Sequence, residues 1–250
     1  MRPASPPILR AVSLAAGLVV AGWTAGDTVA QTAGRVRKPT MDDTIRVNVY
    51  ADNWFMLYVN GELVAVDSIA FIPHNVISVD LLPTYPMTIA VMAKDNADPS
   101  TGMEYANTSV GDGGFILKFG DGTVTDAGWK AKCFSRGPVG GDTTHPSVET
   151  SPIPAGWYAV DFDDSDWGQA RVYGERDIDP KQPYYDADFA GASFIWTDDL
   201  VLDNTVIFRR TVARPPDGRP RADFSKLNDS VPAGGPKPGG RRPPGGGRPR

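Results

Sequence analysis

Apolar residues recur at every second position through much of this 250-residue chain, and this alternation limits the folds it can adopt. Ile45, Val47 and Val49 share one side of such a run, and the polar residues between them share the other. Successive side chains of a β-strand point to opposite faces of a sheet, so the pattern predicts strands with one buried face. No segment keeps a helical period over ten residues, which excludes a helical bundle and a coiled coil.

Turn signals separate these runs. The strongest is Asn60-Gly61, because this pair tolerates the positive φ angles of a type I′ hairpin turn. About nine short strands divided by Gly, Pro and Asp favour an all-β fold, a single antiparallel β-sandwich of the jelly-roll kind. The β-rich runs are residues 44–50, 54–59, 62–66, 75–82, 87–93, 115–119, 123–125, 129–134, 193–196 and 205–212.

The first 30 residues have the features of an export signal. Arginines precede an apolar stretch over residues 11–25, and Ala30 completes a small-residue cleavage site. This stretch is shorter than the roughly 20 residues that span a bilayer, so we expect no transmembrane segment after cleavage, with an uncleaved anchor as the alternative. The pattern predicts a signal peptide over 1–30, a linker over 31–41, and a secreted, periplasmic or cell-surface protein.

Charge divides the chain into three parts. Residues 1–40 carry a net charge of +4, residues 41–212 carry −15 and residues 213–250 carry +6. The last part contains nine Pro and eight Gly and too few apolar groups to offset ordering entropy, so we expect a disordered tail. It is either a solvated linker or a polycation that binds an anionic envelope polymer. The acidic body argues against a specific nucleic-acid partner.

Five motifs follow one another between residues 42 and 212. They are LYVNG (57–61), TIAVMA (88–93), DGTVTDAGWK (121–130), FDDSDW (162–167), and SFIW (193–196) with FRR (208–210). Together they resemble segments of the galactose-binding-domain-like jelly rolls attached to glycoside hydrolases of the α-L-rhamnosidase and β-galactosidase types. The resemblance implies a sandwich over 42–212 that binds carbohydrate or another extracellular ligand, in some members with structural calcium, or that serves only as a scaffold. No catalytic barrel accompanies it, so hydrolase chemistry is not carried over.

The FDDSDW motif and Cys133 also have a structural interpretation. In Asp163-Asp164-Ser165 a short side chain can cap its own turn, and Trp167 would then fold back onto the sheet. The lone Cys133 shares a face of its strand with Trp129, which predicts a buried core thiol rather than a reactive one.

A sugar site needs flat aromatic faces and a few fixed polar groups, and binding residues favour loops on a rigid scaffold. Aromatic residues in segments flanked by Pro, Gly or Asp are therefore the candidates, with packing of the loop or core as the alternative role. The predicted ligand-binding residues are Asp52, Asn53, Trp54, Trp157, Tyr158, Tyr184 and Tyr185.

One acidic loop is a candidate calcium site. Asp95, Asn96, Asp98 and Glu104 offer four side-chain oxygen donors, which is the ligand chemistry that Ca²⁺ prefers. The loop lacks the spacing and the mid-loop glycine of an EF-hand. The alternative is a solvated acidic loop without a metal.

Enzyme motifs are absent from the sequence. There is no Gly-x-Ser-x-Gly elbow, and neither histidine has the spacing of a metal ligand pair. A pair of the many carboxylates could hydrolyse a glycoside, but no residue stands out as catalytic. We therefore predict an exported, non-enzymatic module that binds an extracellular glycan. The alternatives are a structural or adhesion protein that binds a protein or an anionic polymer, and a polysaccharide-active hydrolase or lyase.

Overall fold

A computed structural model describes residues 38–67 and 75–224. The chain divides into one unit that ends at Lys38 and a second unit that begins at Pro39, and the second unit holds the sheets and helices described below. The predicted signal peptide, residues 31–37 of the predicted linker and the tail beyond residue 224 lie outside the described residues.

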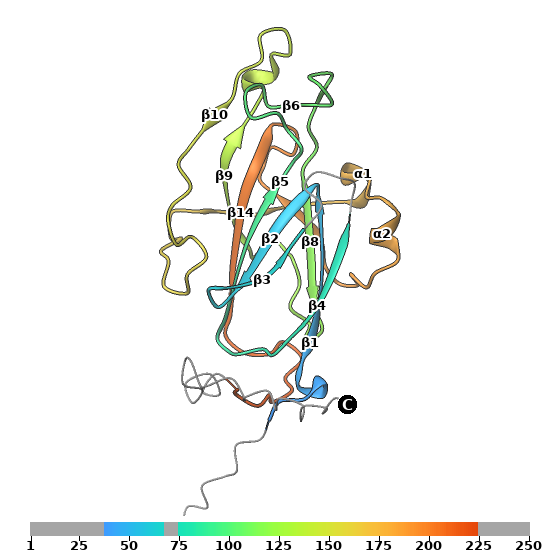
Figure 1. Cartoon of the computed structure of the whole chain (residues 1–250), viewed down its shortest axis with the longest axis vertical. Coiled ribbons are helices and arrows are strands. Elements are labelled where there is room, and N and C mark those ends of the chain that lie inside the picture. The colour runs from blue at the N-terminus through green and yellow to red at the C-terminus, as the bar shows by residue number, and fades with distance from the viewer. Residues whose placement is uncertain (1–37, 68–74, 225–250) are drawn as a thin grey trace, which may run out of the picture. The chain divides into compact units, whose positions relative to one another are not determined.

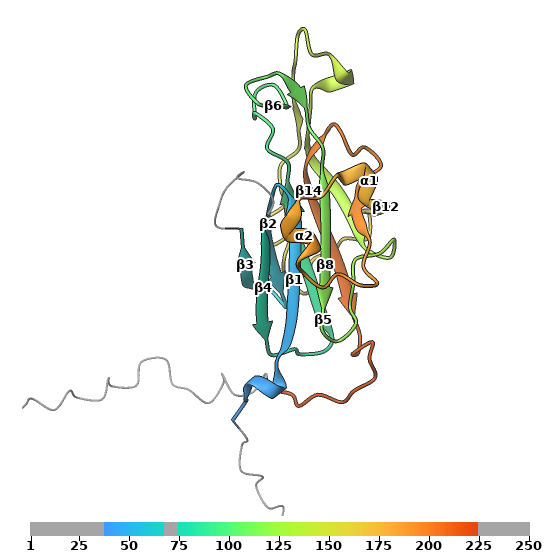
Figure 2. The same cartoon turned by 90° about the vertical axis from the view of Figure 1, so that its right-hand side faces the viewer.

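Two antiparallel sheets make up this unit and lie face to face (Figures 1 and 2). The five-stranded sheet has the order β12 (Arg171–Tyr173), β13 (Phe194–Trp196), β8 (Gly114–Phe119), β1 (Ile45–Asp52) and β4 (Val76–Leu81). The seven-stranded sheet has the order β10 (Glu149–Thr150), β9 (Lys130–Arg136), β14 (Asp203–Val212), β5 (Met87–Lys94), β2 (Trp54–Val59) and β3 (Glu62–Val66), with β11 (Gly168–Gln169) paired to β9. The prediction of a single antiparallel sandwich is confirmed.

Short elements complete the unit. The long excursion between β5 and β8 contains the small hairpin of β6 (Met103–Glu104) and β7 (Ser109–Val110). The helices are η1 (Met41–Asp43), η2 (Val139–Gly141), α1 (Glu175–Ile178) and α2 (Gln182–Tyr185). Among the described residues, none of the helices has the length and apolar character needed to cross a membrane.

The core lies between the two sheets because the alternating apolar residues of both sheets point inward. Phe208 of β14 stacks on Phe115 of β8 with ring centroids 5.3 Å apart, and it also meets Trp196 of β13 at 5.7 Å. All three side chains are fully buried. This aromatic group therefore joins the layers at their centre.

The outer face of the five-stranded sheet is covered by α1, α2 and the segment that follows them (Figure 2). Tyr50 and Ile116 of this sheet pack there against Ile178 of α1 and Phe189. The seven-stranded sheet is different, because only part of its outer face is covered by the chain.

One predicted strand is wrong. Residues 123–125 form only a single bridge, between Val124 and Lys118, at the end of a turn. The carboxylate of Asp121 accepts the backbone N–H of Thr123 at 2.9 Å, and Thr125 Oγ1 donates to the carbonyl of Ser193 at 2.7 Å. The segment therefore lies beside β8 but pairs with it at one position only, and these side-chain bonds replace further strand pairing.

Residues 213–224 belong to the predicted tail and follow β14 without a helix or strand. The N–H of Asp217 donates to the carbonyl of Asp121 at 2.9 Å, and Arg221 binds the Asp217 carboxylate at 2.6 Å. The first part of the tail therefore contacts the end of the sandwich.

Candidate functional site

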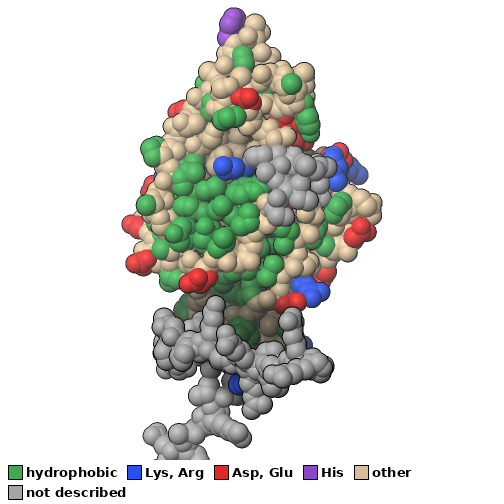
Figure 3. Space-filling model, in the orientation of Figure 1, with side chains coloured by type: hydrophobic (Ala, Val, Ile, Leu, Met, Phe, Trp, Pro, Cys, Tyr) green, Lys and Arg blue, Asp and Glu red, His purple; other side chains and the backbone are tan. Residues whose placement is uncertain are grey.

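An apolar surface rich in aromatic side chains lies on the outer face of the seven-stranded sheet (Figure 3). Phe162 is half-buried at its edge against Trp167, and the other half-buried members are Trp54, Met56 and Tyr58 of β2 and Tyr158 of the segment between β10 and β11. We call these four residues the aromatic face. Buried side chains support them from below, namely Ala90, Met92, Phe134, Trp157, Trp167 and Ile207.

The strand register explains why the aromatic face exists. Residues 54, 56 and 58 of β2 alternate with Phe55, Leu57 and Val59, which point into the core. Met56 pairs with Met92 of β5, and Met92 pairs with Ile207 of β14. Both faces of these strands are therefore apolar, and the outer one is left partly open to solvent.

The segment that carries Tyr158 is fixed by Arg209 of β14, whose side chain is 3% exposed. Its Nε donates to Asp164 Oδ2 at 2.8 Å, its Nη2 donates to the carbonyl of Ala159 at 3.0 Å, and its Nη1 donates to the carbonyl of Trp157. Lys130 binds the same Asp164 carboxylate at 2.9 Å. The buried guanidinium thus ties the segment to the sheet at three points.

The FDDSDW motif has the predicted structural role. Asp163 Oδ1 accepts the N–H of Ser165 at 3.0 Å, which caps the turn. Trp167 is 6% exposed and packs on Phe134 of β9 with ring centroids 5.8 Å apart. The motif therefore positions the segment that supports the aromatic face.

Two tyrosines of the aromatic face stack on each other. The rings of Tyr58 and Tyr158 lie 4.3 Å apart at an interplanar angle of 12°, and Trp157 meets Tyr58 edge-on at 5.2 Å. Among the described residues, neither tyrosine hydroxyl has a hydrogen-bond partner. The pair therefore combines a rigid apolar surface with two polar groups free to bind hydroxyls.

A cation lies at the other end of the aromatic face. The Nζ of Lys94 is 5.6 Å from the ring centroid of Trp54, within the range of a cation–π contact. Lys94 and Trp54 are directly opposite each other in the β5–β2 register. The indole is therefore held by its neighbour while part of its surface stays open.

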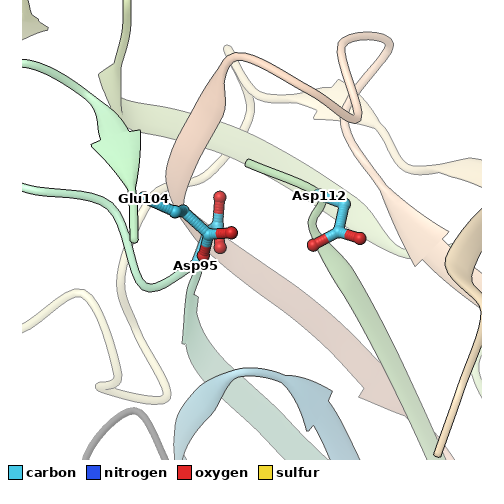
Figure 4. Close-up of side chains that lie close together, drawn as sticks. All are labelled: Asp95, Glu104 and Asp112. Atoms are coloured by element: carbon cyan, nitrogen blue, oxygen red, sulfur yellow. The ribbon is translucent and has the colours of Figure 1, made fainter. Parts of the chain in front are cut away.

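A separate group of carboxylates lies where the β5–β8 excursion meets the end of the sandwich (Figure 4). It comprises Asp95 after β5, Glu104 of β6 and Asp112 before β8, and one carboxylate oxygen of each lies within 4.8 Å of the others. We call it the carboxylate cluster. Figure 4 shows the carboxylates of Asp95 and Glu104 side by side, with Asp112 opposite them.

Burial and mutual repulsion disfavour charge in this region. Burial, the adjacent Glu104 and the charge of Asp112 raise the pKa of Asp95 far above its usual range. Burial and the charges of Asp112 and Glu104 raise the pKa of Asp52, at the end of β1, to about 8. Burial and Glu104 also raise the pKa of Asp112. A group that compensates negative charge would therefore bind here favourably.

The structure divides the predicted ligand-binding residues among three places. Trp54, Trp157 and Tyr158 meet at the aromatic face. Asp52 and Asn53 are buried near the carboxylate cluster, where Asn53 Nδ2 donates to Asp52 Oδ1 at 2.7 Å.

The other two predicted residues belong to α2, where the sequence suggested a loop. Tyr184 packs under the helix, stacked on Phe189 at 5.3 Å, and Tyr185 is 57% exposed. Neither lies at the aromatic face.

The predicted calcium loop is likewise divided. Asp95 and Glu104 belong to the carboxylate cluster. The backbone N–H of Asn96 donates to Asn53 Oδ1 at 2.7 Å. The carboxylate of Asp98 caps its own turn through the N–H and hydroxyl of Ser100, at 2.8 and 2.5 Å.

Sequence reasoning missed three residues of these sites. Met56 and Tyr58 could have been found, because the period-two pattern places them on the same face as Trp54. Asp112 lies between Gly111 and Gly113, and in the sequence this segment shows only the features of a turn.

A polar hollow of about 430 Å³ lies over β9, beyond the aromatic face. Its cation, Arg136, is neutralised by Asp199 at 2.7 Å and by Asp203 at 3.1 Å. Cys133 lines the hollow, and its Sγ donates to the carbonyl of Ser135 at 3.2 Å. No aromatic surface for a sugar ring faces this hollow except that of Phe134, within the part of the chain that the structure describes.

Comparison of the chain with family models, with curated proteins and with solved structures gave no match. The likeness to galactose-binding-domain-like modules therefore stays a prediction from motifs.

Proposed function

We propose that this protein is an exported binding module that holds a carbohydrate on its aromatic face. The observation that carries the proposal is the partly exposed group of Trp54, Met56, Tyr58 and Tyr158 on one face of a rigid sheet (Figure 3). Sugar rings have an apolar side that packs on aromatic rings and hydroxyls that need hydrogen-bond partners. The two tyrosine hydroxyls and the ammonium of Lys94 supply such partners along the rim.

Preorganisation supports the proposal. Exposed aromatic side chains cost little conformational entropy on binding when they are already held in place. Here the stack of Tyr58 on Tyr158 and the three bonds of Arg209 hold them before any ligand arrives. An extended face on β2 and β5 suits a chain of sugar units better than a monosaccharide pocket.

Glycan-array screening of the purified protein, followed by titration of the best ligand, tests this function. We expect Trp54→Ala and Tyr158→Ala each to weaken binding about tenfold or more, because each removes a packed aromatic contact. The control is Tyr185→Ala, which removes an exposed aromatic side chain from α2, away from the aromatic face, and should leave the affinity unchanged.

Two results would contradict the proposal. One is the absence of binding to every glycan by protein that melts cooperatively. The other is a loss of affinity in Tyr185→Ala but not in Trp54→Ala, which would place the ligand at the α2 segment instead.

A further inference from the structure

The carboxylate cluster contains two oxygen atoms whose environment is incomplete. Asp95 is 3% exposed and Glu104 is 2% exposed, so water does not solvate their charges. Asp95 Oδ2 and Glu104 Oε1 are buried without a hydrogen-bond partner in the described residues. A buried carboxylate oxygen without a partner is costly, and here two of them lie in the same small group.

Among the residues that the structure describes, basic groups do not fill this gap. Lys181 is the cation whose charge reaches Asp52 and Asp112, but its Nζ binds Asp179 at 2.7 Å. Lys181 therefore acts on Asp52 and Asp112, whereas the unpartnered oxygens belong to Asp95 and Glu104. The described residues therefore supply no compensating charge to Asp95 and Glu104.

Backbone geometry holds Asp95 in place. Its Oδ1 accepts the N–H of Asn96 at 2.6 Å, while its Oδ2 lies so close to Gly111 that a Cβ there would be 1.6 Å away. Only glycine leaves room for this carboxylate. The segment that carries Asp112 thus passes directly over Asp95, which brings the three carboxylates together.

We propose that Asp95, Glu104 and Asp112 bind one Ca²⁺ ion, which fastens the β5–β8 excursion to the end of the sandwich. Three carboxylates offer six hard oxygen atoms on three separate segments, and water can complete the coordination. The all-oxygen donor set suits Ca²⁺ and disfavours Zn²⁺ and copper, which prefer nitrogen or sulfur. This site is independent of the aromatic face, so either proposal can fail without the other.

The experiment compares full-length protein freed of metal by chelation with the same protein in Ca²⁺. We expect calorimetric titration to show one Ca²⁺ bound per chain. At about 100 times the dissociation constant, the melting temperature should rise by about 5–10 °C. Mg²⁺ should have a much smaller effect, because it loses its water shell reluctantly.

Glu104→Gln separates a Ca²⁺ ligand from a side chain that only packs. The amide removes like-charge repulsion, so this variant should melt above the wild type in chelator and should lose the increase in Ca²⁺. Asp112→Asn, at the exposed rim, should fold normally and bind Ca²⁺ at least tenfold more weakly. Glu62→Gln and Asp98→Asn are the matched controls, since both side chains are exposed and outside the cluster, and both should keep the full Ca²⁺ response.

Several outcomes would overturn the proposal. One is that Ca²⁺ gives neither binding heat nor a shift in melting temperature. Another is that Mg²⁺ gives an equal shift. A third is that both Glu104→Gln and Asp112→Asn keep the Ca²⁺ response. Absence of a Ca²⁺ response with no stabilisation by Glu104→Gln would show instead that Asp95 and Glu104 share a proton.

Discussion

At the scale of single residues, Arg209 has the most demanding position in the described part of the chain. Its guanidinium lies on the outer side of the sheet, but the segment around Trp157 and Asp164 covers it. A buried cation is tolerated only when its donors are satisfied, and here carboxylate and carbonyl oxygens do so. The same contacts position Tyr158, so one residue connects stability with the proposed binding surface.

We therefore expect Arg209→Met to lower the free energy of unfolding by about 3 kcal/mol or more, because Asp164 and two carbonyls lose their partner. Chemical denaturation measures this loss. The control is Arg46→Met, since Arg46 also binds a carboxylate through two nitrogens, to Asp80 at 3.0 and 2.8 Å, but is 63% exposed. That variant should lose far less stability, because solvent screens an exposed ion pair. Equal losses in the two variants would contradict this account.

Cys133 should be an unreactive thiol. Burial and the charge of Asp203 raise its pKa from 9.0 to about 12. At pH 8 the native protein should therefore be alkylated about a thousandfold more slowly than the unfolded chain, because the thiolate is the nucleophile. The raised pKa also affects stability. Above about pH 9 the thiol of the unfolded chain ionises while that of the folded protein does not, so the free energy of unfolding declines as the pH rises toward 12.

Timed iodoacetamide labelling with mass spectrometry, with and without denaturant, measures both rates. Rapid labelling of the native chain at pH 8 would show that the hollow over β9 stabilises a thiolate.

At the scale of elements, the Asn60-Gly61 turn shows how much a local signal can predict. Asn60 and Gly61 have φ angles of 50° and 83°, as a type I′ turn requires. The sequence did not predict that Asn60 also binds the neighbouring strand connection. Its Nδ2 donates to the carbonyl of Thr84 at 3.0 Å, and its Oδ1 accepts the N–H of Thr88 at 2.7 Å.

Two substitutions separate these roles. Asn60→Gly keeps the positive φ but loses both hydrogen bonds, and we expect a loss of about 2 kcal/mol. Gly61→Ala meets no atom within 4 Å and should cost only about 1 kcal/mol, from backbone strain. Thermal or chemical denaturation of both variants tests the order. A larger loss for Gly61→Ala would show that strain, and not the contacts of Asn60, governs this turn.

Elements with a repeating pattern were predictable, and those held by side-chain contacts were not. Apolar, β-rich runs gave β1, β2, β5 and β14 nearly to the residue, with alternating burial in β2 and burial of both faces in β5. The two-residue strands β6, β7, β10 and β11 are too short to show a period. Residues 123–125 form only one bridge to β8, because Asp121 offers a local hydrogen bond that competes with strand pairing.

The candidate sites were predictable only in part for a similar reason. Residue type indicated Trp54, Trp157 and Tyr158 one by one. Their meeting on one face depends on the register of β2 against β5 and on the contacts of Arg209, which the sequence does not show. Likewise, Asp95 and Glu104 belong to one acidic loop in the sequence, whereas Asp112 joins them only because the chain returns past Gly111.

At the scale of the whole sandwich, stability depends on contacts that cross between the sheets. Phe208 of the seven-stranded sheet touches Phe115 and Trp196 of the five-stranded sheet, and all three are fully buried. Neither sheet can keep its apolar inner face in water alone, so the two layers should unfold together. The aromatic face would then be lost in the same step as the core.

Phe208→Ala should therefore lower the free energy of unfolding by about 3–5 kcal/mol and leave a single transition. Far-ultraviolet circular dichroism follows the sheets and tryptophan fluorescence follows the core, and the two curves should coincide in wild type and variant. Phe162→Ala is the control, since Phe162 packs only on the outer side, 5.6 Å from Trp167, and should cost about 1–2 kcal/mol. If the two probes separated in Phe208→Ala, the sheets would be distinct cooperative units, and an intact aromatic face could outlast the loss of the core.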